Sequence, residues 1–145
     1  MLPLFLYCVR WGMKSGFVVC LAFGVLQIFV QGVLAYGWQS ILLDYIAAFT
    51  VIGVAGLFRG RERGIFWGTL LGAAARFAVH FISGITIYRI LAPTELFNTT
   101  FTSPWMYSLA YNGSYVAIDT AICLIIFAAL YLPLRRYITG ADLRK

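Results

Sequence analysis

Charged side chains are scarce in this chain: only 11% of its 145 residues are Asp, Glu, Lys or Arg, and 62% are hydrophobic. A mean hydropathy of +0.88 lies well outside the range of soluble domains. Histidine occurs once, as His80. Cys8, Cys20 and Cys123 stand in apolar surroundings without CxxC spacing, and one histidine cannot complete a metal cluster with them. These shortages predict an integral membrane protein without a metal site.

Motifs for nucleotide binding and catalysis are missing as well. The sequence contains no Walker A loop, GxGxxG fingerprint, HExxH motif or nucleophile elbow. Its formal net charge of +6 is explained by membrane topology. Because no soluble segment interleaves basic with aromatic residues, we expect no nucleic acid partner. We therefore expect no enzyme and no cofactor, and any energy source must come from other chains.

Long apolar runs are what the chain has instead. About 20 apolar residues cross the hydrocarbon of a bilayer, and residues 15–36, 38–58, 65–90 and 105–132 are long enough. Residues 1–9 are apolar too, but nine helical residues rise only about 13 Å, so they form the end of a helix. The expected fold is an all-α integral membrane protein: a bundle of four full transmembrane helices plus an N-terminal partial helix, in one domain over residues 1–145.

Basic residues set the expected orientation in the membrane. Nine of the eleven Lys and Arg fall within residues 10–14, 59–63 and 135–145. Two predicted spans separate each of these segments from the next, so all three lie on the same side of the membrane. The positive-inside rule makes that side cytoplasmic, together with the C-terminus. The loop at residues 91–104 then lies outside, where it either covers a site or serves as a plain connector.

Polar and aromatic side chains gather in the outer half of the predicted bundle. Asp44 lies less than two turns into the second span, and His80, Gly84 and Tyr88 repeat at four-residue spacing in the third. The last span opens with a dense aromatic segment that contains Trp105, Tyr107, Tyr111, Asn112 and Tyr115. Aromatic faces and a carboxylate attract cations. This half of the bundle therefore predicts an outward-facing cavity for a small, flat, polar or cationic ligand. Gly84 has no side chain, so a ligand could lie flat between His80 and Tyr88.

Each of these residues also has a plainer interpretation. His80 can bond a carbonyl as packing between helices, and Asp44 can be a solvated group at a helix entrance. The tyrosines and Trp105 suit an interfacial aromatic belt, and Asn112 before Gly113 can mark a helix irregularity. Their joint occurrence at one depth favours the binding site.

Arg76 and Asp119 stand apart, because both are expected near the middle of the bilayer. Either charge alone would be expensive there. We therefore expect the two side chains to pair with each other, or through the polar network below the site, in a structural role.

Four segments together resemble one family: PLFLYCVRWGMKSG, LLDYIAAFTVIGVAGLF, RFAVHFISGITIY and YSLAYNG. They are similar to the thiamine-specific S-components (the ThiT family) of energy-coupling-factor (ECF) vitamin transporters. The resemblance implies a six-helix subunit of the bacterial plasma membrane that binds thiamine in an outward-facing pocket. It also implies an ECF transmembrane coupling protein and two ATPase subunits as partners. The ligand-binding positions that it implies are Asp44, Tyr45, His80, Tyr88, Tyr107 and Asn112.

The chain also departs from the family pattern. Asp44 stands where the family often has glutamate, and Tyr88 where it often has tryptophan. A family tyrosine falls on Leu34, so that Tyr36 or Trp38 would take its place. Gly84, Trp105 and Tyr111 are further candidates for the pocket. The family's first helix has no counterpart, so the chain is expected to be N-terminally truncated relative to the family.

Three alternatives follow from these departures and from the polar residues themselves. The ligand is another small vitamin or a thiamine precursor; the protein is a membrane enzyme that uses His80 and Asp44 as an acid–base pair; or its polar residues only hold the helices of a structural membrane protein together.

Overall fold

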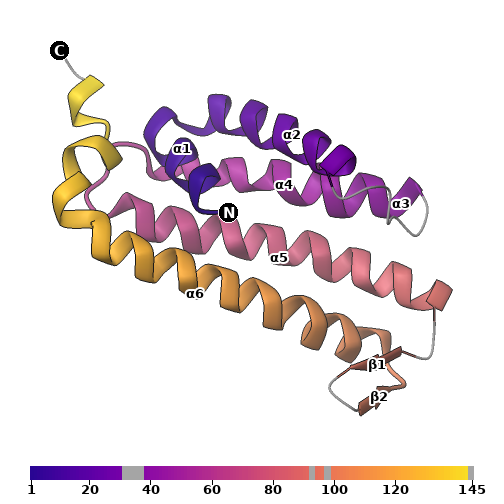
Figure 1. Ribbon diagram of the computed structural model, residues 1–145. Coiled ribbons are helices and arrows are strands. Elements are labelled where there is room, and N and C mark those ends of the chain that lie inside the picture. Colours follow the sequence, from indigo (N-terminus) through magenta and orange to yellow (C-terminus); the bar gives the residue numbers. More distant parts are fainter. Residues whose placement is uncertain (31–37, 92–93, 97–98, 144–145) are drawn as a thin grey trace.

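The structure is a computed structural model of residues 1–145 (Figure 1). It describes residues 1–30, 38–91, 94–96 and 99–143, with the side chains of residues 87–100 and 143 excepted.

Four helical stretches in the described residues are long and apolar enough to cross a membrane: Met13–Val30, Trp38–Phe58, Gly64–Thr86 and Pro104–Ile138. A short helix, α1 (Leu2–Trp11), precedes them. The four predicted spans and the N-terminal partial helix are thus confirmed, and the chain is a multi-pass membrane protein. The last helix, α6 (Pro104–Ile138), continues past its predicted end at residue 132, with Pro133 inside it. Figure 1 shows this helix turning at its yellow end, as a proline within a helix explains.

The helices pack as two neighbouring layers (Figure 1). Helix α5 (Gly64–Leu91) runs antiparallel beside α6, and α2 (Met13–Val30) lies beside the second span. The short α1 contacts all of these elements, and its Phe5, Cys8 and Val9 are almost fully buried in the core with Ile52 and Phe127.

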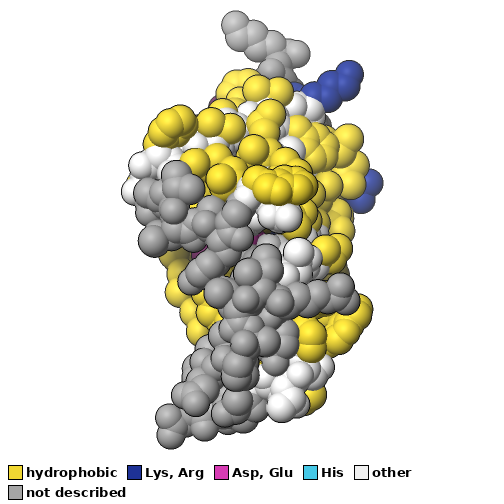
Figure 2. Space-filling view, turned by 90° about the vertical axis from the view of Figure 1, so that its right-hand side faces the viewer, with side chains coloured by type: hydrophobic (Ala, Val, Ile, Leu, Met, Phe, Trp, Pro, Cys, Tyr) yellow, Lys and Arg dark blue, Asp and Glu magenta, His cyan; other side chains and the backbone are white. Residues whose placement is uncertain are grey.

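Large apolar side chains cover the outer surface of the helices. Phe29 and Leu132 are 78% and 82% exposed, which suits lipid and not water as the neighbour. Figure 2, turned to face the end of the molecule that lies to the right in Figure 1, shows hydrophobic side chains over most of the described surface. Lys and Arg appear only near its upper right margin.

The second span is an irregular helix. It begins as α3 (Trp38–Ser40), continues as a π-helix, η1 (Ile41–Ala47), passes through α4 (Ala48–Thr50) and ends as a 3-10 helix, η2 (Val51–Phe58). The π segment carries Asp44, and such segments often occur at functional sites. In η2, a Cβ on Gly56 would lie 2.3 Å from the backbone nitrogen of Met13, so only glycine allows this contact with the turn between α1 and α2.

The loop between α5 and α6, which was expected either to cover a site or to serve as a plain connector, contains a short hairpin. Strands β1 (Thr94–Leu96) and β2 (Thr99–Phe101) pair antiparallel, with Thr94 opposite Phe101. Threonine and phenylalanine favour strands, and two residues between the strands are enough for a hairpin connection.

Several basic residues were predicted to lie in cytoplasmic segments. Among those that the structure describes, only Arg10 is buried. Its Nη1 and Nη2 lie 2.9 and 2.5 Å from the two carboxylate oxygens of Asp142, which follows α6 in the short 3-10 helix η3 (Ala141–Leu143). Nη1 also donates to the carbonyl oxygen of Tyr137. This contact fastens α1 to the C-terminal segment.

Candidate ligand-binding site

Asp44 and His80 meet between the second span and α5. His80 Nδ1 lies 3.1 Å from Asp44 Oδ1, and the side chains are 9% and 22% exposed. Ser40 precedes Asp44 by four residues, and its hydroxyl donates to Asp44 Oδ2 at 2.8 Å. A carboxylate is thus held in the bundle interior beside a hydroxyl and an imidazole.

Helix α6 supports His80 from the other side. Asn112 Nδ2 donates to the carbonyl oxygen of His80 at 2.9 Å and to Ser108 Oγ at 3.0 Å. Ser108 Oγ donates in turn to the carbonyl oxygen of Phe81 at 2.7 Å. These bonds fix the backbone of α5 at the histidine, so Asn112 orients the site.

Gly84 is part of this helix contact. A Cβ at this position would lie 2.3 Å from Ser108 Oγ and 2.7 Å from Asn112 Nδ2. The space that we expected a flat ligand to use is therefore filled by side chains of α6. The four-residue spacing from His80 placed Gly84 on a face of α5 but did not say which neighbour covers that face.

Arg76 joins the same network from one turn earlier on α5. Its Nε donates to His80 Nε2 at 3.3 Å, and its Nη1 lies 3.5 Å from Asp119 Oδ2. The guanidinium also lies 4.9 Å from the ring centre of Phe49 and 5.8 Å from that of Tyr115. The two charges expected to pair are thus within ion-pair distance, and the bond to His80 is an additional link. We call the residues joined by these contacts the His80 cluster: Ser40, Asp44, Arg76, His80, Ser108, Asn112 and Asp119.

A row of tyrosines on α6 leads to the His80 cluster. Tyr107 and Tyr111 stack with ring centres 5.8 Å apart and an angle of 7°, and Tyr115 follows edge-on at 5.9 Å. The ring of Tyr115 meets His80 edge-on at 5.6 Å. Spacing of four residues along α6 produces this row, which offers aromatic faces beside a carboxylate.

The remaining predicted pocket residues take no part in the side-chain hydrogen bonds of the cluster within the described part of the chain, or lie outside that part: Trp38, Trp105, Tyr45, Tyr36 and Tyr88. Trp38 and Trp105 are 70% and 61% exposed, as suits an aromatic belt. Tyr45 follows Asp44 in η1 and is half-buried. Tyr36 and the side chain of Tyr88 lie outside the described residues.

Ser83 is a residue that sequence reasoning missed. It is 1% exposed and faces Asp44, yet its Oγ makes no hydrogen bond of ordinary geometry with the described residues. A buried hydroxyl needs a hydrogen-bond partner, and the Asp44 carboxylate is the group beside it. The sequence could have indicated Ser83 by its position three residues after His80, because this spacing places both side chains on the same face of a helix.

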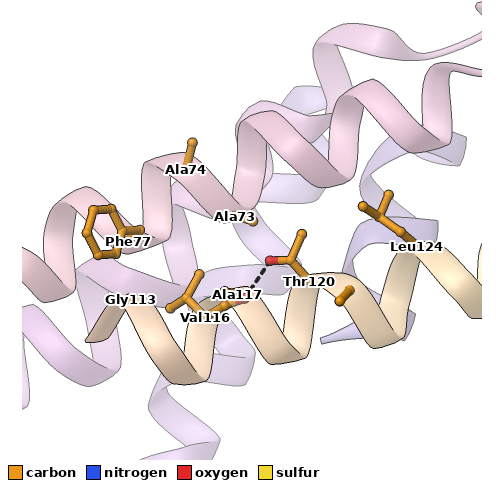
Figure 3. Close-up of a pocket in the computed structure, with 9 residues that line it drawn as sticks. Ala73, Ala74, Phe77, Gly113, Val116, Ala117, Thr120 and Leu124 are labelled. Atoms are coloured by element: carbon orange, nitrogen blue, oxygen red, sulfur yellow. Dashed lines mark hydrogen bonds between the residues drawn. The ribbon is translucent and has the colours of Figure 1, made fainter. Parts of the chain in front are cut away.

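A separate cavity of about 430 Å³ lies along the outer faces of α5 and α6. Figure 3 shows Ala73, Ala74 and Phe77 on one side of it and Gly113, Val116, Ala117, Thr120 and Leu124 on the other. The hydroxyl of Thr120 is already bonded to the carbonyl oxygen of Val116 at 2.6 Å. With no charged side chain in its lining, this groove does not suit a cationic ligand.

Within the described ranges, no group of three or more His, Cys, Asp or Glu residues is placed to hold a metal ion.

Comparisons with known proteins cover nearly the whole chain. The family model described as "Thiamine transporter protein (Thia_YuaJ)" matches residues 1–139. The protein "Thiamine transporter ThiT" of Bacillus subtilis (strain 168) is 32% identical over 94% of this chain and 74% of its own length. "Thiamine transporter ThiT" of Lacticaseibacillus paracasei is 26% identical over 90% of this chain and 70% of its own length. The chain therefore belongs to the thiamine transporter family Thia_YuaJ.

Proposed function

We propose that this chain is the substrate-binding membrane subunit of an ECF-type vitamin transporter and that it captures thiamine at the His80 cluster. The observation that carries this proposal is the pairing of Asp44 with a hydroxyl and an imidazole at 2.8 and 3.1 Å. Thiamine joins a flat aminopyrimidine to a cationic thiazolium. A buried carboxylate bonded to a hydroxyl and an imidazole is a suitable partner for that positive ring.

The surrounding groups complement the rest of the ligand. The row formed by Tyr107, Tyr111 and Tyr115 offers faces and edges for stacking and for cation–π contact. Ser83 contributes a buried hydroxyl with both donor and acceptor capacity. Asn112 keeps the α5 backbone in place at His80. Recognition then uses binding contacts and no covalent chemistry, so the chain acts as a binding subunit and not as an enzyme.

The orientation of the site follows from the basic segments. If Arg59, Arg61, Arg63 and the C-terminal arginines lie in the cytoplasm, the His80 cluster opens toward the outside, where a capture subunit must meet its ligand. The sequence carries no nucleotide-binding motif. Uptake therefore needs a transmembrane coupling protein and two ATPase subunits from other chains.

A ligand panel tests the proposal. The full chain, purified in detergent or nanodiscs, is titrated with thiamine, with the separate pyrimidine and thiazole halves, and with other small vitamins. Binding is read by thermal shift and by the fluorescence of its four tryptophans. We expect thiamine to give the largest rise in Tm and a saturable change in fluorescence. A response to another vitamin with none to thiamine would overturn the substrate, and no response to any member would overturn the binding function.

Transport is tested separately in proteoliposomes. Uptake of labelled thiamine should require a coupling protein and its ATPases from an ECF transporter together with ATP. Uptake by the chain alone, driven by the thiamine gradient, would contradict the need for partner subunits.

A further inference from the structure

The hydrogen bonds around His80 determine where its proton lies. Arg76 Nε carries a hydrogen and has no acceptor capacity. Since it approaches His80 Nε2 at 3.3 Å, that ring nitrogen must be the acceptor and carries no proton. A neutral imidazole then bears its hydrogen on Nδ1, which donates to Asp44 Oδ1 at 3.1 Å. Arg76 thus donates to His80, and His80 donates in turn to Asp44.

A doubly protonated His80 does not fit these surroundings. Its Nε2–H would point at the N–H of Arg76, which places two donors and two positive charges against each other. The other groups facing the ring are the Asp44 carboxylate and the edge-on ring of Tyr115. Asp119 lies within ion-pair distance of Arg76, so this carboxylate compensates the guanidinium and not the imidazole.

The charge of the site follows from this arrangement. With His80 neutral, the charged groups of the His80 cluster are Asp44, Asp119 and Arg76, two anions and one cation that leave one net negative charge. If His80 were a cation, the same cluster would be neutral. A neutral cluster inside the bundle would attract a cationic ligand much less.

We propose that Arg76 is a positioning residue of the ligand site: its donation to His80 Nε2 holds the ring in the neutral, Nδ1-protonated form and leaves one uncompensated negative charge at Asp44 for a monocationic ligand. The assignment of the ligand rests on the proposed function, whereas the state of the His80 ring does not. Arg76 itself stays behind the histidine, in the ion pair with Asp119.

The single histidine makes the proposal directly measurable. The full chain is prepared with ¹⁵N-labelled histidine, and the two ring nitrogens are recorded by NMR at neutral pH without ligand. They are assigned by their couplings, because Nε2 couples to both carbon-bound ring protons and Nδ1 mainly to one. We expect a protonated Nδ1 and an unprotonated Nε2. The reverse assignment, two protonated nitrogens, or a fast exchange between tautomers would overturn the proposal.

Two variants separate the donor from the charge. In Arg76→Met the donor to Nε2 is gone, so the ring can take a second proton and leave the neutral Nδ1-protonated form. A His80 cation would then compensate the charge of Asp44 directly, and the Kd for thiamine should rise about tenfold. Asp119→Asn removes the charge partner of Arg76 but keeps its Nε, so the Nδ1-protonated form should persist. An equal change of the ring signals in both variants would overturn the role of the Arg76 donor.

The outcomes also separate this proposal from the proposed function. The expected ring state with no binding of thiamine would reject the function and keep the role of Arg76 at His80. Binding of thiamine with the other ring state would keep the function and reject that role. Because the unmodified protein alone decides the ring state, a failure of Arg76→Met to fold leaves the test intact.

Discussion

Among the described side chains, those of Arg10 and Arg76 are only 6% and 13% exposed, and comparing their partners separates a contact that holds the fold from the proposed binding site. Arg10 contacts both oxygens of Asp142 at 2.9 and 2.5 Å, and its guanidinium lies 3.7 Å from the ring centre of Tyr137. One carboxylate is thus neutralised by one cation in a bidentate pair. At the other arginine, Arg76, the guanidinium is divided between His80 Nε2 and Asp119.

The difference shows what makes a polar cluster available to a ligand. Asp142 has both oxygens bonded to an arginine, so no part of its charge is left for another molecule. Asp44 is bonded to a serine hydroxyl and an imidazole, which satisfy its hydrogen bonds and leave its charge. The neighbouring Ser83 hydroxyl has no partner of ordinary geometry among the described residues. An ion pair whose charges cancel stabilises the fold. A carboxylate whose hydrogen bonds are made but whose charge is not cancelled can bind a cationic ligand.

Matched carboxylate-to-amide changes are the strongest way to break this comparison. In Asp44→Asn the anion at the His80 cluster is lost, and the Kd for thiamine should rise about 100-fold or more, since removing one partner of a buried charge contact costs about 2–5 kcal/mol. Asp142→Asn removes the same charge at the other arginine and should leave the Kd within about twofold. Isothermal titration of both proteins measures this. Equal losses of affinity would mean that Asp44 has no special role.

Two glycine changes test how closely α5 and α6 must approach at the His80 cluster. Gly84→Ala would place a Cβ 2.3 Å from Ser108 Oγ and 2.7 Å from Asn112 Nδ2. We expect the two helices to separate, stability to fall by about 1–3 kcal/mol as in other overpacked sites, and the Kd for thiamine to rise about tenfold. Thermal unfolding and a thiamine titration measure the two effects.

Gly113→Ala is the matched control on the facing helix. Its Cβ would meet only the Phe77 ring, at an ordinary 3.8 Å, so both Tm and Kd should stay close to those of the parent. If Gly84→Ala behaved like Gly113→Ala, the hydrogen bonds from Asn112 and Ser108 would not be what orients His80.

Sequence alone predicted the spans and the depth of the site, for reasons that the structure makes plain. Span length depends only on local hydropathy, and a rise of about 1.5 Å per residue places Asp44 and His80 at one depth. Two residues at the same depth on different helices need not have side chains in contact. The π-helical segment at Ile41–Ala47 changes the direction of Asp44 by a shift that local composition does not reveal.

Sequence reasoning predicted the long-range pair of Arg76 with Asp119, because two charges in mid-bilayer need partners, but it missed the pair at the end of the bundle. Arg10 and Asp142 are far apart in sequence, and Arg10 was counted only among the basic residues that orient the chain. Nothing local distinguishes a buried arginine from one in solvent at the end of a helix. Gly84 was assigned to the pocket for the same reason: its helix face was known, but the residues of α6 that cover it were not.

The contact of Arg10 with Asp142 should matter for stability and not for binding. Arg10→Met removes the hydrogen bonds that join the buried guanidinium on α1 to the segment after α6, so Tm should fall by several degrees. Below the transition, the Kd for thiamine should remain within about twofold. Lys14→Met, which removes a basic side chain at an exposed position on α2, should move neither quantity. A loss of binding at unchanged Tm would contradict this division of roles.

Acid should weaken the contact between Arg10 and Asp142, and we expect this effect to be the smallest of the four predicted here. The hydrogen bonds from Arg10 lower the pKa of Asp142 below its ordinary value, which is about 3.9. A carboxyl with a lowered pKa in the folded protein contributes stability above its ordinary pKa and loses it as the pH falls through the lowered one. Tm measured from neutral pH down to about pH 3 should therefore fall more steeply in the parent than in Asp142→Asn, which has no charge to lose. Parallel curves would mean that Arg10 is held by Tyr137 and that its pairing with Asp142 adds nothing to the fold.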